Sequence, residues 1–384
     1  MNYFLFGVFL LLCYIHFPSS FACIIHKTKS TETSSVKGKS SFLWKIEANP
    51  PSYLFGTMHV PYVLVWDAIP TIVMEAFNSS QKFYSEVNHD IPENEAENSC
   101  GLLLPNNQVV SDILPSNVYD KLQSYIEYLK DQIVSWQMDN KNTKRLSRYI
   151  IRKKLFPNWK RMKIVWLWIR IFNIEKSVIV TEKYPILDDY LHELAKNEGK
   201  FVGGIESAKE QCDIVNKLKE SHIIFWISEM LKYENNEIFA RATQGINQEI
   251  SNFRNGIDTD EGTCKFIEYD KEHGQQQIGE EYETYMRNVM LVERNKKMAK
   301  RIINLLINEP KTSFFFAFGT AHFICGESVV DIMRQTGFHV NRIDTKTFNW
   351  TKNYNSGARL VYSNFFIVCF YFIFCALISY IISK

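Results

Sequence analysis

The stretch FFFAFGTAHF spans residues 314–323, and the related stretch YLFGTMH spans residues 53–59. Each is a short apolar run that ends in an aromatic residue and continues as Gly-Thr-x-His. A continuous apolar run of this length is typical of a strand that is buried on both faces. Two such units far apart in one chain indicate a weak internal repeat, which predicts two related halves around a common core.

Further strands and helices are predicted on either side of these units. β-branched and aromatic residues next to turn residues predict strands at 42–46, 82–87, 200–205 and 338–343. Apolar residues at helical spacing predict helices at 68–77, 278–308 and 326–335, and over most of 116–249. Strands separated by helices predict an α/β fold with buried strands, two pseudo-repeated strand-GTxH halves and a helical insertion at about 116–249.

His59 and His322 stand at the same place in the two units, three residues after a glycine that ends an apolar run. The carboxyl ends of such strands are where α/β folds place their binding sites. Neutral imidazole is the commonest metal ligand, although a lone histidine near a core is more often only hydrogen-bonded. Because the same context occurs twice, we interpret His59 and His322 as metal ligands.

Two glutamates lie at the ends of other predicted strands. Glu86 is near the end of 82–87, and Glu206 directly follows 200–205. A carboxylate at the point where a strand leaves the core is costly unless it is paired or bound to a metal. We therefore take Glu86 as a metal ligand and catalytic candidate, and Glu206 as a second catalytic candidate. The alternative for both is a charge at a helix N-terminus, which applies more readily to Glu206.

Arg294 interrupts the apolar stripe of the predicted helix at 278–308. The stripe is formed by Met290, Met298, Ile302 and Leu305. A guanidinium on this stripe either extends to solvent past its apolar neighbours or meets a carboxylate or an oxyanion in a cleft. The second alternative makes Arg294 a third catalytic candidate.

Several common motifs are absent from the sequence. His192 and Glu193 begin like a zincin motif, but the second histidine of HExxH is missing. The chain has no GxSxG, P-loop or GxGxxG sequence, which disfavours serine hydrolases and nucleotide-dependent enzymes. The net charge of +2 gives no general attraction to a polyanion, and no nucleic-acid-binding motif is present. We therefore expect no nucleic-acid partner.

Both ends of the chain indicate a protein of the secretory pathway. Residues 1–22 resemble a signal peptide, and residues 23–41 a flexible arm. Residues 365–382 carry no charge and are long enough to cross a bilayer as a transmembrane helix, after a juxtamembrane linker at 346–364. The domain at 42–345 is then extracellular, in a single-pass type I protein of the cell membrane. The alternative is a GPI anchor, because small residues precede the apolar tail.

The cysteines agree with this compartment. Outside the two terminal apolar segments they are Cys23, Cys100, Cys212, Cys264 and Cys325. An oxidising compartment favours disulfides, and the odd number leaves one cysteine without an intramolecular partner. The sequence leaves their connectivity open. Sequons at Asn78 and Asn349 predict N-glycosylation.

Five stretches, in order, resemble the Tiki metalloproteases of the TraB superfamily. They are FLWKIEANPPSYLFGTMHVPYVLVWDAIP at 42–70, FYSEV at 83–87, IESAKEQC at 205–212, ERNKKMAKRI at 293–302 and FFFAFGTAHF at 314–323. The first stretch is the most specific, since a Pro-Pro turn, FGTxHVPY and VWD occur together. The resemblance extends over about 42–342 and is loose from about 140 to 249.

The resemblance implies an extracellular peptidase, dependent on Mn²⁺ or Co²⁺, that trims the N-terminus of Wnt proteins and is a negative regulator of Wnt signalling. It implies a site of His59, His322 and Glu86, supported by Glu206 and Arg294. Imidazole and carboxylate ligands also suit Zn²⁺ or Fe²⁺. The competing interpretation is a non-catalytic binding protein or decoy receptor at the membrane. A further interpretation keeps the fold and makes the protein an esterase or a haem-binding protein.

Overall fold

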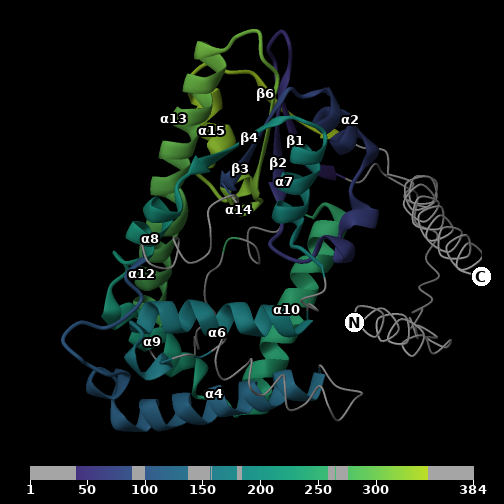
Figure 1. The fold of residues 1–384 in the computed structure, drawn as a ribbon. Coiled ribbons are helices and arrows are strands. Elements are labelled where there is room, and N and C mark those ends of the chain that lie inside the picture. The colour runs from purple at the N-terminus through teal and green to yellow at the C-terminus, as the bar shows by residue number, and fades with distance from the viewer. Residues whose placement is uncertain are drawn as a thin grey trace, which may run out of the picture. The chain divides into compact units, whose positions relative to one another are not determined.

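The computed structural model describes residues 40–88, 100–136, 156, 158–179, 184–257, 264 and 276–344. Its core is a 6-stranded sheet of order β4-β3-β5-β2-β1-β6. The strands are β1 (Ser40–Ile46), β2 (Ser52–Thr57), β3 (Lys82–Val87), β4 (Phe201–Glu206), β5 (Phe314–Gly319) and β6 (Val340–Asp344). β4, β3, β5 and β2 are parallel neighbours, whereas β1 pairs antiparallel with β2 and β6 (Figure 1). The four parallel strands therefore end at the same edge of the sheet.

The predicted strands are all found, with small changes at their ends. The strand at 82–87 is confirmed at both ends as β3. β1 begins at Ser40, inside the end of the flexible arm predicted at 23–41. The reason is that Ser41 is buried, and its Oγ donates a hydrogen bond of 2.6 Å to the carbonyl oxygen of Ile343.

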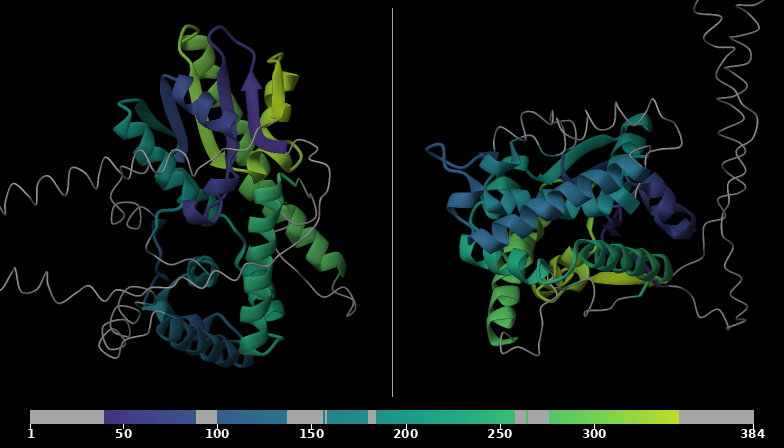
Figure 2. Two further views of the ribbon diagram at one scale, coloured as in Figure 1. Left: turned by 90° about the vertical axis from the view of Figure 1, so that its right-hand side faces the viewer. Right: turned by 90° about the horizontal axis from the view of Figure 1, so that it is seen from below.

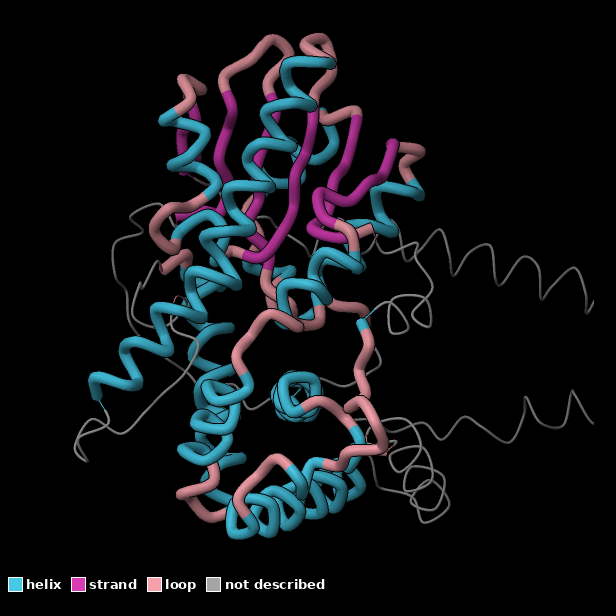
Figure 3. The backbone as a smooth tube through the Cα atoms, turned by 90° about the vertical axis from the view of Figure 1, so that its left-hand side faces the viewer, coloured by secondary structure: helices cyan, strands magenta, loops and turns pink. Residues whose placement is uncertain are grey.

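Helices cover both faces of the sheet, whose strands are magenta in Figure 3. One face packs against α2 (Thr71–Ser79) and α7 (Leu187–Asn197), and the other against α13 (Glu293–Asn308) and α15 (Val329–Gln335). The side chains of β5 alternate between these two cores. Phe314 and Phe316 pack on the α13 side and Phe315 on the α7 side, all fully buried. The strand predicted to be buried on both faces is thus confirmed.

A separate hydrophobic core lies among helices. Its main members are α4 (Ser116–Trp136), α6 (Ile164–Ile179), α9 (Glu220–Met230) and the first turns of α10 (Asn235–Asn255). α10 continues to the sheet (Figure 2). There Phe253 packs against both sheet cores. The cluster agrees in part with the helical insertion predicted at about 116–249, because α7 and β4 within that range belong to the sheet layers instead. It also includes Met286 and Val289 from beyond that range, because their apolar side chains pack on α9 and its neighbours.

The single helix predicted at 278–308 is wrong in its middle. α12 (Gln276–Arg287) passes into a π-helical segment at Asn288–Val292 before α13 begins at Glu293. π-helical turns are rare and occur frequently at functional sites. This one changes the helical register directly before Arg294.

Two other helices begin later than predicted. α2 starts at Thr71 instead of residue 68, because Pro70 has an extended conformation and caps the helix. α15 starts at Val329 instead of residue 326, because Ser328 is its N-cap and accepts a hydrogen bond of 3.1 Å from the backbone N–H of Asp331.

Two disulfides join Cys100 to Cys212 and Cys264 to Cys325. The expected disulfide formation is confirmed for these four cysteines, and the structure supplies the connectivity that the sequence left open. Cys212 lies on α8 (Ala208–Val215), and Cys325 follows α14 (Ala321–Ile324). Each disulfide therefore restrains an element that, as described below, carries a site residue.

Several predictions fall outside the described residues. These are the signal peptide at 1–22, Cys23, the linker at 346–364, the transmembrane helix at 365–382 and the sequon at Asn349. Within the described ranges, no helix is both long and apolar enough to cross a bilayer. Asn78 is exposed in the last turn of α2, and its glycosylation stays a prediction.

Candidate metal centre

The carboxyl ends of the parallel strands bring the predicted site residues together. His59 follows β2, Glu86 lies near the end of β3, and Glu206 ends β4. His322 lies in α14, directly after β5. β2 and β5, which carry the two Gly-Thr-x-His units, are neighbours in the sheet. The internal repeat therefore places its two histidines beside each other.

Three side-chain atoms face a common space. Glu86 Oε2 lies 3.9 Å from His59 Nε2 and 3.9 Å from His322 Nε2. The backbone N–H of Gly319 donates a hydrogen bond of 3.3 Å to Glu86 Oε2. A Cβ atom on Gly319 would lie 3.4 Å from His59 Nε2 and 3.6 Å from Glu86 Oε2. The glycine thus leaves open a space that a side chain would enter.

The first glycine of the repeat has a different role. A Cβ atom on Gly56 would lie 2.9 Å from Thr320 Oγ1, which is closer than side chains pack. The missing side chain lets Thr320 donate two hydrogen bonds to the carbonyl oxygen of Thr57, from its backbone N at 2.9 Å and its Oγ1 at 2.7 Å. These bonds connect the two units of the repeat.

The two histidines differ in exposure. The side chain of His59 is 50% exposed, whereas that of His322 is 4% exposed. The common space is therefore open to solvent on the side of His59.

Each histidine is hydrogen-bonded at its second ring nitrogen. His59 Nδ1 lies 2.9 Å from Asp188 Oδ2, and Asp188 Oδ1 accepts a hydrogen bond of 2.5 Å from Thr57 Oγ1. His322 Nδ1 lies 2.6 Å from Asn295 Oδ1. Hydrogen bonds of this kind are typical of histidines that bind metals through the other nitrogen.

Arg294 joins the two glutamates. Its Nη2 donates to Glu86 Oε1 and, at 2.6 Å, to Glu206 Oε2, while its Nε donates to both oxygens of Glu206. Gln211 Nε2 also donates to both carboxylates, at 2.8 Å to Glu86 and 3.2 Å to Glu206. Arg294 and Glu206 are buried. Of the two alternatives for Arg294, the one in which it meets carboxylates is confirmed.

Burial and the charge of Arg294 together set the protonation states of Glu86 and His322. Burial alone would raise the pKa of Glu86, but Arg294, with the two histidines, holds that pKa well below its usual range. Burial, and then the charge of Arg294, lower the pKa of His322 to about 3. At neutral pH Glu86 is therefore a carboxylate and His322 a neutral imidazole, the forms in which these groups bind metals.

The donor set fits a divalent metal ion. Within the described ranges, no group of three or more His, Cys, Asp or Glu side chains is already arranged closely enough to hold one. Tetrahedral ligands with bonds of about 2.1 Å lie about 3.4 Å apart, so the 3.9 Å separations need to close by about 0.5 Å. The connected side chains also carry three carboxylates, of Glu86, Glu206 and Asp188, against one guanidinium. A divalent ion would neutralise this excess.

All five residues that the sequence predicts for the site lie in this cluster, which is joined by the contacts given above. Sequence reasoning missed Asp188, Asn295 and Gln211. Asn295 and Gln211 stand next to predicted residues in the stretches ERNKKMAKRI and IESAKEQC, which is the only signal that marks them. Asp188 lies in the first turn of α7, where an acidic residue is ordinarily only a favourable helix-terminal charge.

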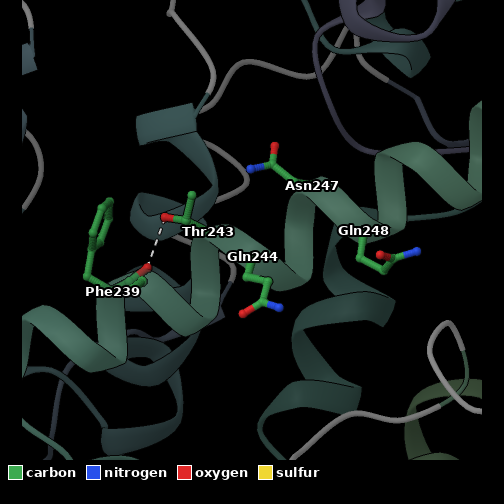
Figure 4. A pocket seen from close by; sticks show the side chains of 6 residues that line it. Phe239, Thr243, Gln244, Asn247 and Gln248 are labelled. Carbon is green, nitrogen blue, oxygen red and sulfur yellow. Dashed lines mark hydrogen bonds between the residues drawn. The ribbon is translucent and has the colours of Figure 1, made fainter. Parts of the chain in front are cut away.

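A separate pocket lies along one side of α10. It is lined by Phe239, Ala240, Thr243, Gln244, Asn247 and Gln248 (Figure 4). The hydroxyl of Thr243 donates a hydrogen bond of 2.9 Å to the carbonyl oxygen of Phe239 within the helix. Because none of the lining side chains titrates near neutral pH, this pocket offers no acid–base chemistry. The strand-end cluster is therefore the candidate active site.

The helix that carries Gln211 is fixed to α13 by an ion pair. Arg301 donates to both carboxylate oxygens of Glu210, and the backbone N–H of Glu210 donates to the N-cap Ser207 at 3.2 Å. The hydrogen bond from Arg301 lowers the pKa of Glu210 to about 2. The ion pair thus favours the ionised form of Glu210 in the folded chain.

This ion pair predicts an acid-sensitive contribution to stability. Because the pKa of Glu210 is 4.5 ordinarily and about 2 in the folded chain, its contribution is full above about pH 4.5 and is lost as the pH falls toward 2. We expect Glu210→Gln to lower the urea midpoint of unfolding at about pH 7, and to lower it less at about pH 3. A midpoint difference that does not change with pH would contradict this assignment.

Comparison with known proteins gives consistent matches. The profile of the TraB/PrgY/gumN family matches residues 42–342. The Danio rerio protein named Metalloprotease TIKI1 is 32% identical over 309 residues, which cover 78% of this chain and 63% of that relative. The Nematostella vectensis protein named Metalloprotease TIKI homolog is 30% identical over 329 residues, covering 82% of this chain and 69% of the relative.

The Homo sapiens protein named Metalloprotease TIKI1 is 30% identical over 314 residues, which cover 78% of this chain and 61% of the relative. The chain thus spans between 61% and 69% of the length of these three relatives. No solved structure matches the chain. The family match over residues 42–342 and the relatives at about 30% identity show that the chain belongs to the TraB/PrgY/gumN family and, within it, to the Tiki group.

Proposed function

We propose that this chain is a metal-dependent peptidase whose metal ion is bound by His59, His322 and Glu86. The observation that carries the proposal is the convergence of these three donors at the ends of neighbouring parallel strands, around the space beside Gly319. The names of the relatives favour a peptidase over an esterase or a haem-binding protein. The proposal needs only one metal site.

The residues of the chain have separate roles in this proposal. A divalent ion, when bound, polarises a peptide carbonyl and makes a bound water more acidic. Glu86 is kept ionised by Arg294 and presents Oε2 toward the histidines, so it is placed both to bind the ion and to accept a proton. Glu206 is buried and accepts hydrogen bonds from Arg294 and Gln211, so we propose that its role is to hold Arg294 in place.

Arg294 has a second proposed role as a stabiliser of negative charge. Its guanidinium is bonded to both glutamates, so it acts on a developing oxyanion from behind Glu86 and not by direct contact. We expect its main effect to be on the charge of Glu86.

We further propose a secreted protein as substrate, with the N-terminus of Wnt proteins as the candidate, and hence a negative regulator of Wnt signalling. The two disulfides support an oxidising compartment. In this proposal residues 1–22 are a signal peptide. The chain is held on the cell surface by a transmembrane helix at 365–382 or, alternatively, by a GPI anchor. Asn78 and Asn349 carry glycans. Mn²⁺ or Co²⁺ is the proposed ion, which mixed imidazole and carboxylate ligands suit.

The proposed function is tested by cleavage of a Wnt N-terminal peptide with the full-length chain. Mass spectrometry would read the products with added Mn²⁺ or Co²⁺, with and without EDTA. We expect EDTA to stop cleavage, and His59→Ala or His322→Ala to slow it more than about 100-fold, since loss of a residue behind a ligand already costs about 10- to 100-fold.

His339→Ala is the matched control, because His339 is exposed before β6 and lies outside the strand-end cluster. It should leave the rate of cleavage unchanged. A well-folded chain that binds the peptide and cleaves nothing would favour the non-catalytic binding protein instead.

A further inference from the structure

The two histidines of the metal centre are held by residues from distant parts of the chain. Asp188, in α7, contacts His59, and Asn295, in α13, contacts His322. Both partner side chains are buried, at 2% exposure for Asp188 and 0% for Asn295. Burying such polar groups is costly unless each makes a specific hydrogen bond.

The chemistry of the two partners fixes the proton on each ring. An ionised carboxylate only accepts hydrogen bonds, so the bond between Asp188 and His59 requires the proton on Nδ1. In the second pair, Asn295 Nδ2 donates 3.0 Å to the carbonyl oxygen of Glu327, which leaves Oδ1 as the atom facing His322 Nδ1. His322 is therefore also protonated at Nδ1. In a neutral ring of this tautomer the lone pair is on Nε2, the ring nitrogen that in each histidine lies 3.9 Å from Glu86 Oε2.

Each partner is itself held in place. Asp188 accepts a hydrogen bond of 2.5 Å from Thr57, and its segment is joined to that of His59 by the bond from Leu187 N to the carbonyl oxygen of Val60, at 2.9 Å. The carbonyl oxygen that orients Asn295 belongs to Glu327, whose φ of 54° is unusual for a residue with a side chain. An uncommon backbone conformation is kept only where the surrounding structure determines it.

We propose that Asp188 and Asn295 are positioning residues that fix His59 and His322 as Nδ1–H tautomers, with both Nε2 lone pairs directed to the metal position. The inference rests on the proposed metal centre but not on any particular substrate. Its physical basis is that a histidine binds a metal only through a nitrogen without a proton. A ring in the other tautomer would first have to lose its orienting hydrogen bond.

The first test reads the tautomers directly, without metal and without substrate. Imidazole ¹⁵N spectra of the full-length, metal-free chain at about pH 8 distinguish Nδ1–H from Nε2–H rings. We expect Nδ1–H for both His59 and His322, and a shift of His59 toward Nε2–H in Asp188→Ala. An Nε2–H ring at either position in the unsubstituted chain would overturn the proposal.

The second test is the affinity for Mn²⁺, measured by titration calorimetry. We expect Asp188→Ala and Asn295→Ala each to weaken it about 10- to 100-fold. In Asp188→Asn the side-chain oxygen still accepts a hydrogen bond from His59 Nδ1, and the side-chain NH₂ donates to Thr57 Oγ1. This variant should therefore keep the Nδ1–H tautomer of His59 and bind Mn²⁺ more tightly than Asp188→Ala. Its retained fold and tautomer separate positioning from simple loss of structure.

Asp213→Ala is the control, because Asp213 is exposed on α8 and pairs with Lys209. It should change neither the tautomers nor the affinity. Unchanged Mn²⁺ affinity in both Asp188→Ala and Asn295→Ala would overturn the proposal. Failure of the peptidase assay alone would contradict the proposed function but not this inference, because neither the ¹⁵N spectra nor the Mn²⁺ titration involves cleavage.

Discussion

Gly319→Ala is expected to abolish metal-dependent cleavage while leaving the chain as stable as before. The added methyl group would stand 3.4 Å from His59 Nε2 and 3.6 Å from Glu86 Oε2, in the space that the ion and its open coordination position need. These distances are ordinary van der Waals contacts in the metal-free chain, and Gly319 is not among the glycines with positive φ. We expect a loss of about 100-fold or more in cleavage rate. Unfolding free energy should be unchanged or higher by up to about 1 kcal/mol.

The matched control is Gly245→Ala. Gly245 lies in α10, and a Cβ atom there meets nothing within 4 Å. It should stabilise the chain by about 1 kcal/mol through helix propensity and leave cleavage unchanged. Thermal unfolding and peptide turnover, measured on the same preparations, compare the two variants. Full activity of Gly319→Ala would show that the metal ion is not bound beside this glycine.

Arg294→Met is expected to be the most destabilising substitution in the site. The guanidinium is the only cation among the site contacts described above, where it pairs with both Glu86 and Glu206. Its removal leaves both carboxylates without their cationic partner, and breaking a buried pair in this way costs about 3–5 kcal/mol. Urea unfolding at neutral pH, with methionine chosen to keep the apolar packing along α13, measures the loss.

Arg301→Met is the control for this result. Arg301 lies on the same helix and pairs with Glu210, but its side chain is 38% exposed. An exposed pair contributes about 1 kcal/mol or less, so this variant should be only slightly less stable. The double variant Arg294→Met with Glu206→Leu removes one unpaired carboxylate and should recover part of the loss. Equal losses for the two arginines would contradict a buried network.

The residues that meet at the strand ends were predictable because the signal for each is local. His59 and His322 occur in the same short pattern, and a strand that ends in a glycine is visible in the sequence on its own. The parallel sheet then brings the ends of β2, β3 and β5 together. Glu86 was predictable for the same reason, since it is a charged residue near the end of a strand whose other side chains are largely apolar and buried.

The residues that hydrogen-bond to the two histidines were not predictable in this way. Asp188 reaches His59 across 129 positions of sequence, through the backbone bond between Leu187 and Val60. No local sequence pattern predicts such a contact, because it depends on how α7 packs on the sheet. The π-helical turn before Arg294 was hidden for a different reason. Apolar residues continue on both sides of it, so the periodicity suggests an uninterrupted helix.

The most direct measurement of the central claim is the metal content of the full-length chain after dialysis against Mn²⁺ or Co²⁺. Elemental analysis would be done on the unsubstituted chain and on the double variant His59→Ala, His322→Ala, with circular dichroism to confirm that both are folded. The account predicts one divalent ion for each unsubstituted chain and none for the double variant. Equal metal content in the two, or peptide cleavage by a metal-free chain in EDTA, would contradict a metal centre built from the two Gly-Thr-x-His units.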